Sequence, residues 1–156
     1  MCNSFLASRG YLSSYGLMHA TQMLRLLRQL TDPVIIADLA RAGVLRRLDL
    51  EGSVLVLPLL AHLLATQLKE NQLAAMEEIS QMLVNFGPLI RATRGVIHNA
   101  VGIDLNAEER QQRCKAFCEH MGKILISLQR IASLCGPTGA YAQRLQEDLH
   151  SIVEPS

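Results

Sequence analysis

Aromatic side chains are scarce in this chain, and tryptophan is absent. Aromatic residues make up 4% of the 156 residues, whereas 49% of the residues are hydrophobic. Leucine and alanine therefore carry most of the apolar content. A leucine-rich chain with few aromatic and few β-branched runs favours helices, and no stretch alternates polar and apolar residues as a half-buried strand would. We expect an all-α fold.

The chain also has no strong excess of either charge. Its formal net charge at pH 7 is +1, so no global field would steer it to nucleic acid. The uncharged run at residues 52–68 resembles a membrane span, but a span needs about 20 apolar residues and this shorter run contains Pro58, His62 and Gln67. We interpret the run as a buried central helix and expect neither nucleic acid nor a membrane as a partner.

Paired cysteine motifs are missing as well. None of the four cysteines, at positions 2, 114, 118 and 135, belongs to a C-x-x-C motif, which favours a reduced, intracellular protein. The first residues also lack the basic and long apolar regions of a signal peptide. The sequence therefore predicts a cytoplasmic protein.

The helical pattern predicts one domain of about six helices. Residues 1–13 are polar and predict a flexible N-terminus, and residues 14–153 predict the domain. The segments with helical periodicity are residues 14–30, 32–43, 52–68, 70–85, 88–99, 107–134 and 141–153. These helices follow one another as antiparallel pairs, which predicts a HEAT-like or armadillo-like array.

Local signals set several of the expected helix ends. Asp32 is a predicted N-cap, Pro33 the first helical residue, and Gly43 the residue past the end. Gly87 followed by Pro88 predicts a break between two helices.

The long helix predicted from Ala107 to Leu134 has its own start signal and one broad apolar face. Asn106 and Glu109 resemble a capping box. The apolar stripe of this helix consists of Cys114, Cys118, Met121, Leu125, Leu128, Ala132 and Cys135, widened by Phe117, Ile124 and Ile131.

No residue pattern points to catalysis or to a cofactor. Cys114 and Cys118 share a helix face, but His120 points elsewhere and a tetrahedral zinc site needs four converging ligands. We predict that both cysteines are structural, and keep a redox or zinc sensor as an alternative. The acidic pairs are adjacent in sequence and diverge by about 100° on a helix, so they cannot face one another. We predict a protein that is not an enzyme and needs no metal or cofactor.

Basic residues gather in the first turns of the long helix, at Arg110, Arg113 and Lys115. One interpretation is that Glu109 pairs with Arg113 four residues later on the same helix. The other is that an acidic partner docks there.

Several segments together resemble the C-terminal domain of the katanin regulatory subunit. They are LRRLDL (residues 45–50), an apolar helix containing LPLL, FGPLI (residues 86–90) and VGIDLNAEERQQRCKAFCEHM (residues 101–121). The resemblance implies an all-helical, non-catalytic domain that binds the N-terminal domain of the catalytic AAA ATPase subunit as a heterodimer. It further implies binding to microtubules and to partner peptides at spindle poles and minus ends.

The resemblance also implies roles for individual residues. Arg110 and Arg113 match positions used toward the acidic microtubule surface, and Lys115, which clusters with them in the sequence, is predicted to contribute to the same contact. Leu68, Met121 and Ile124 fall at positions like those that line the partner groove, where the family tends to have an aromatic residue at position 68.

With 156 residues the chain resembles domain-only relatives that lack the WD-repeat propeller. We expect it in the cytoplasm and on the cytoskeleton, at microtubules, spindle poles, centrosomes or basal bodies. The alternative is a generic helical scaffold that is not linked to tubulin.

Overall fold

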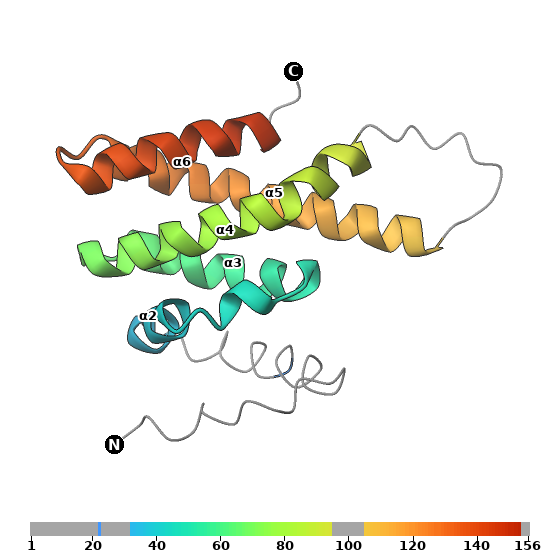
Figure 1. The fold of residues 1–156 in the computed structure, drawn as a ribbon, viewed down its shortest axis with the longest axis horizontal. Coiled ribbons are helices and arrows are strands. Elements are labelled where there is room, and N and C mark those ends of the chain that lie inside the picture. Colours follow the sequence, from blue (N-terminus) through green and yellow to red (C-terminus); the bar gives the residue numbers. More distant parts are fainter. Residues whose placement is uncertain (1–21, 23–31, 95–104, 154–156) are drawn as a thin grey trace.

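Two stacked helical hairpins form most of the structure (Figure 1). The computed structural model describes residue 22 and residues 32–94 and 105–153. The elements in these residues are α2 (Pro33–Arg41), the 3-10 helix η1 (Leu45–Arg47), α3 (Leu50–Ala65), α4 (Lys69–Arg94), α5 (Leu105–Ala132) and α6 (Pro137–Val153), with no strand among them. The protein is therefore an all-α single domain, as predicted. The boundary predicted at residues 13 and 14, and all but Gln22 of the helix predicted at residues 14–30, lie outside the described residues.

The hairpins α3–α4 and α5–α6 lie in the same orientation. An ion pair joins Glu51 to Arg113 near the N-termini of α3 and α5, and a hydrogen bond joins Leu64 to Arg130 near their C-termini. The two helices therefore run parallel. The predicted likeness to HEAT and armadillo arrays stays a prediction, because two hairpins do not define a repeat series.

The local signals at the first described helix act as predicted. The Asp32 side chain accepts a hydrogen bond from the backbone N–H of Val34 at 2.9 Å, and Pro33 opens α2. Gly43 has φ +66°, a left-handed conformation that glycine adopts without strain. Asp49 caps α3 in the same way by accepting from the N–H of Gly52 at 2.8 Å.

The break predicted at Gly87 and Pro88 is wrong, because α4 continues through both residues to Arg94. Pro88 removes the hydrogen bond to the carbonyl of Val84, but both residues are exposed, so water can satisfy that carbonyl. Gly87 instead faces α6: a Cβ atom there would lie 3.0 Å from Cδ1 of Ile152. The glycine permits close packing of α4 on α6.

The ends of the last two helices also differ from the predicted ones. Because α5 begins at Leu105, Asn106 lies inside its first turn and is not the N-cap. The helix ends at Ala132, which leaves Cys135 outside it and exposed, so its assignment to the apolar stripe is wrong. Gly136, with φ +110°, turns the chain, and α6 begins at Pro137, four residues before the predicted start.

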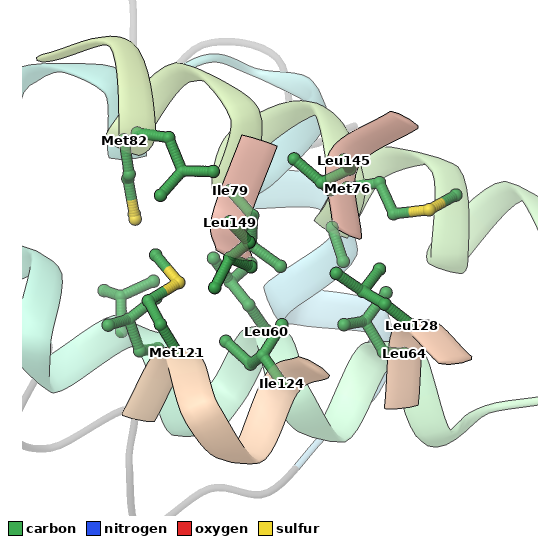
Figure 2. Packing of buried hydrophobic residues seen from close by; sticks show 14 of the residues in the cluster. Leu60, Leu64, Met76, Ile79, Met82, Met121, Ile124, Leu128, Leu145 and Leu149 are labelled. Atoms are coloured by element: carbon green, nitrogen blue, oxygen red, sulfur yellow. The ribbon is translucent and has the colours of Figure 1, made fainter. Parts of the chain in front are cut away.

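The core lies between the hairpins and takes residues from all four long helices. Figure 2 shows Leu60, Leu64, Met76, Ile79, Met82, Met121, Ile124, Leu128, Leu145 and Leu149 directed into the same space. Burying each such side chain stabilises the fold by about 1.5–3 kcal/mol. Phe86 and Phe117 add an edge-to-face contact between α4 and α5, with ring centroids 6.0 Å apart. This core holds α5 in place along most of its length.

Candidate functional site

The three basic residues of α5 point to different sides of the helix. Successive helical residues are turned by about 100°, so Arg113 and Lys115 lie on nearly opposite sides. Arg113 lines a hollow between α3 and α5, whereas Lys115 lines a groove between α4 and α5. All three residues are exposed, but they do not form one basic patch.

Arg113 is placed between two carboxylates. Its Nη2 atom lies 3.3 Å from Oε2 of Glu109 and 3.6 Å from Oε2 of Glu51. The predicted pairing with Glu109 is therefore confirmed, and Glu51 adds a second partner from α3. The surrounding hollow has a volume of about 310 Å³ and an apolar floor that includes Val54 and Leu55. With two carboxylates and one guanidinium, the hollow carries no surplus positive charge.

Lys115 stands on the rim of a larger groove between the end of α4 and the start of α5. The groove has a volume of about 750 Å³ and contains two further charged residues, Glu108 and Glu119. Its walls include Thr93, whose Oγ1 lies 3.7 Å from the thiol of Cys114. The charges on this side of α5 are mixed, so Lys115 does not create a strong positive field.

Arg110 is the basic residue that the structure leaves open for an acidic partner. It lies four residues before Cys114 and seven before Phe117, so it shares the core-facing side of α5. It sits beyond the packed core, however, and is exposed. Within residues 32–94 and 105–153, no carboxylate forms an ion pair with it.

The three residues predicted to line a partner groove differ in how exposed their side chains are. Met121 and Ile124 are 0% exposed and point into the core beside Ile79 and Leu149 (Figure 2). They line no open groove in this structure, because α3, α4 and α6 cover them. Leu68 follows the end of α3 and is 63% exposed. It is therefore the residue of the three that offers apolar surface to a partner.

A second apolar side chain lies at the same end of the molecule as Leu68. Leu134 follows the end of α5 and is 50% exposed. The parallel course of α3 and α5 brings the α3–α4 and α5–α6 turns to one end, at the left of Figure 1. We call this region the turn end, defined by Leu68 and Leu134. The sequence placed Leu134 inside a longer helix and so gave no sign of its exposure.

The cysteines occupy three environments. Cys114 is buried, Cys118 is partly buried against the core, and Cys135 is exposed. In the described part of the chain, no three His, Cys, Asp or Glu side chains come close enough to hold a metal ion. Burial of Cys114 agrees with the structural role predicted for it.

The segments that form these surfaces match a known family. The profile of the con80 domain of katanin matches residues 17–149, which is most of the chain. The chain belongs to this family. A curated relative, the Katanin p80 WD40 repeat-containing subunit B1 homolog KTN80.2 of Arabidopsis thaliana, is 27% identical over 132 residues. The alignment covers 82% of this chain and 11% of that relative. Among solved structures, none is significantly similar to the chain.

The con80 match includes both ends of the molecule described above. It contains Leu68 and Leu134 at the turn end and Arg110 at the other end, and it stops at Leu149 within α6. The helices of this con80 domain that the structure describes include none that is both long and apolar enough to span a bilayer. What these surfaces offer chemically is non-covalent contact with another macromolecule.

Proposed function

We propose that this con80 domain is a non-catalytic regulatory or adaptor module of a katanin-type AAA ATPase. In this role it binds the N-terminal domain of the catalytic subunit and contributes to microtubule binding and severing. The observation that carries the proposal is the family match over residues 17–149. The corresponding location is the cytoplasm and the microtubule cytoskeleton, including spindle poles, centrosomes or basal bodies.

The turn end is the surface that we assign to the catalytic subunit. Leu68 and Leu134 are large apolar side chains at adjacent turns, and exposed apolar groups are the usual centre of a stable protein interface. A stable heterodimer should bury on the order of 1,600 Å² in total. Two leucines supply the centre of such an interface and not its whole area, so neighbouring polar residues of α4 and α6 would form its rim.

The opposite end of α5 is the surface that we assign to microtubules. Arg110 is exposed there, and a guanidinium can bind a carboxylate through two parallel hydrogen bonds. Residues 110 and 132 are separated by about 33 Å along the helix at 1.5 Å per residue. An adaptor could therefore hold the ATPase at one end and an acidic surface at the other. Lys115 adds a weaker contribution from the α4 side, and Arg113 adds little because two carboxylates already neutralise it.

Co-purification tests the main proposal. The domain and the N-terminal domain of a katanin catalytic subunit should elute together in gel filtration at micromolar concentration. Leu68→Asp should abolish this co-elution, because it places a charge at the centre of the apolar contact. Val84→Asp is the matched control, since Val84 is 68% exposed in the middle of α4. Separate elution of the two wild-type domains would refute the proposal.

The second candidate is a helical scaffold that binds other proteins without tubulin. The observation that favours it is the number of exposed apolar side chains outside the turn end, such as Val84 and Ile126. Microtubule co-sedimentation distinguishes the two candidates. A folded domain that stays in the supernatant at low salt, alone and with the catalytic subunit, would favour the scaffold. Partner peptides from spindle-pole or minus-end proteins are a further class to test by the same co-elution.

A further inference from the structure

Ser133 is the first residue after α5 and begins an exposed turn that runs through Gly136 to α6. Its Oγ atom donates a hydrogen bond to the backbone carbonyl of Arg130 at 2.7 Å. That carbonyl belongs to the last turn of α5, where water can replace the serine as a donor. The hydroxyl therefore lies on the surface and bonds within its own helical turn.

The sequence around Ser133 carries one charge, which is positive. Arg130, three residues before Ser133, is the only charged residue between Lys123 and Arg144, and Leu134 follows the serine. Many Ser/Thr kinases bind their substrates through carboxylates that accept an arginine at this spacing, and a guanidinium can meet a carboxylate through two hydrogen bonds. Such a cleft would repel an acidic residue near the hydroxyl, and this stretch of sequence has none. The pattern fits a kinase of this class.

Arg130 also joins the two hairpins beside this turn. Its Nη2 atom donates to the carbonyl oxygen of Leu64, in the last turn of α3, at 3.2 Å. A neutral carbonyl is a weaker partner for a guanidinium than a phosphate on serine, which carries a charge of about −1.5 to −2 at pH 7. Residues three apart on a helix are neighbours. A phosphate on Ser133 would therefore compete with Leu64 for Arg130.

We propose that Ser133 is a phosphorylation site for an arginine-directed Ser/Thr kinase and that its phosphate draws Arg130 away from Leu64. In the transfer, Oγ of Ser133 bonds to the γ-phosphorus of ATP as the bond from that phosphorus to the β–γ bridging oxygen breaks. The hydroxyl proton passes to a carboxylate of the kinase, and ADP leaves. Loss of the contact from Arg130 to Leu64 loosens α3 against α5. The phosphate also places negative charge beside Leu134 at the turn end.

The last turn of α5 has to open before a kinase can act on this site. Ile131 lies between the arginine and the serine and is 1% exposed, so a kinase that binds an extended substrate must draw it from the core. The terminal turn of a helix opens more readily than its interior. We expect the folded domain to be phosphorylated about 10–100-fold more slowly than a peptide of residues 126–137, the factor that exposing one isoleucine implies.

Phosphorylation of the whole chain tests the site. The protein is incubated with ATP and a calmodulin-dependent kinase that selects arginine three residues before the acceptor, and modified residues are located by mass spectrometry. Thr31, which also follows an arginine by three residues, is replaced by alanine in every sample. Ser133 should be modified, and Arg130→Gln should slow the reaction at least about tenfold. Ser151 is the matched control: it is exposed at the end of α6 and donates to the carbonyl three residues earlier at 2.7 Å, but that residue is Asp148. It should stay unmodified.

Amide hydrogen exchange tests the movement of Arg130. With Ser133 phosphorylated, residues 62–68 at the end of α3 should exchange at least about threefold faster than in unmodified protein. In Arg130→Gln, phosphoserine installed at position 133 during synthesis should add no further increase, because the contact to Leu64 is already lost. Phosphoserine installed at position 151 should leave residues 62–68 unchanged.

Three results would overturn the proposal. The first is modification of Ser133 in the folded protein no faster than that of Ser151. The second is phosphorylation of the peptide without any phosphorylation of the folded protein at Ser133. The third is unchanged exchange at residues 62–68 when Ser133 carries phosphate.

Discussion

A pair of variants separates the structural role of Arg113 from the binding role assigned to Arg110. The first variant, Glu109→Ala with Arg113→Ala, removes one charge of each sign and so preserves the net charge. It breaks the helical pair at 3.3 Å and the contact from Arg113 to Glu51 at 3.6 Å. A helical pair contributes about 0.3–0.5 kcal/mol and an exposed pair between helices about 0.2–1 kcal/mol.

The expected loss of stability is therefore about 0.5–1.5 kcal/mol, which lowers the thermal midpoint by about 1–6 °C for a domain of this size. Microtubule co-sedimentation of this double variant should match that of wild type. Arg110→Ala should behave in the opposite way. Its stability should stay within about 0.5 kcal/mol of wild type, because no described residue pairs with it. The apparent dissociation constant for microtubules should rise about 1.5–5-fold, and the remaining binding should depend less on salt.

Both quantities are measured on the same preparations, by thermal unfolding and by co-sedimentation at two salt concentrations. The reasoning fails if the double variant loses microtubule binding as strongly as Arg110→Ala. It also fails if Arg110→Ala unfolds several degrees earlier than wild type, because Arg110 would then have a structural partner.

Two cysteine and two glycine substitutions test the packing of the fold. Cys114→Ser should destabilise by about 1–3 kcal/mol, because it buries a more polar group; Cys135→Ser at an exposed site should not change the urea midpoint. Gly122→Ala should stabilise by about 1 kcal/mol, since a Cβ there meets nothing within 4 Å. Gly139→Ala should destabilise by about 1–3 kcal/mol, because its Cβ would overlap the carbonyl oxygen of Leu134; equal midpoints for the two glycine variants would contradict this. Because burial in the folded state raises the pKa of the Glu78 carboxyl, the folded state favours its protonated form. The stability gained by protonating Glu78 is therefore present below the pKa of the unfolded state and is lost as the pH rises through the pKa of the folded state. The stability of Glu78→Gln relative to wild type should therefore be greatest at neutral pH and decline on acidification, and a pH-independent difference in urea unfolding would refute it.

The parts of the fold that local chemistry decides could be predicted from the sequence. Asp32, Pro33 and Gly43 define α2 through contacts within a few residues. Long-range packing decides the rest. Gly87 and Pro88 normally end a helix, but here α6 covers the glycine and water reaches the carbonyl that the proline leaves free, so α4 continues. A sequence alone does not show which helix will lie against a given glycine.

In the candidate site, too, contacts within one helix could be predicted from the sequence, whereas contacts between helices could not. The pair of Glu109 and Arg113 follows from their spacing, whereas Glu51 comes from another helix and depends on the stacking of the hairpins. Met121 and Ile124 belong to the apolar stripe of α5, and that pattern predicts their burial. The family resemblance assigned both residues to a partner groove instead. Both side chains are buried in the structure, as the apolar stripe predicts. The stripe marks the face of α5 that packs in the core.

The parallel course of α3 and α5 has an electrostatic consequence. Aligned peptide dipoles place about half a positive charge at the N-terminus of a helix, and parallel stacking brings two such poles to one end of the molecule. Asp49 and Glu51 at the start of α3, and Glu108 in the first turn of α5, offset these poles in part. The C-termini of α4 and α6 bring two negative poles to the same end, so an acidic chain that approaches Arg110 meets, besides the guanidinium, chiefly the nearby positive pole of α5. That pole contributes about 0.3–1 kcal/mol at low salt, and no side-chain substitution removes it.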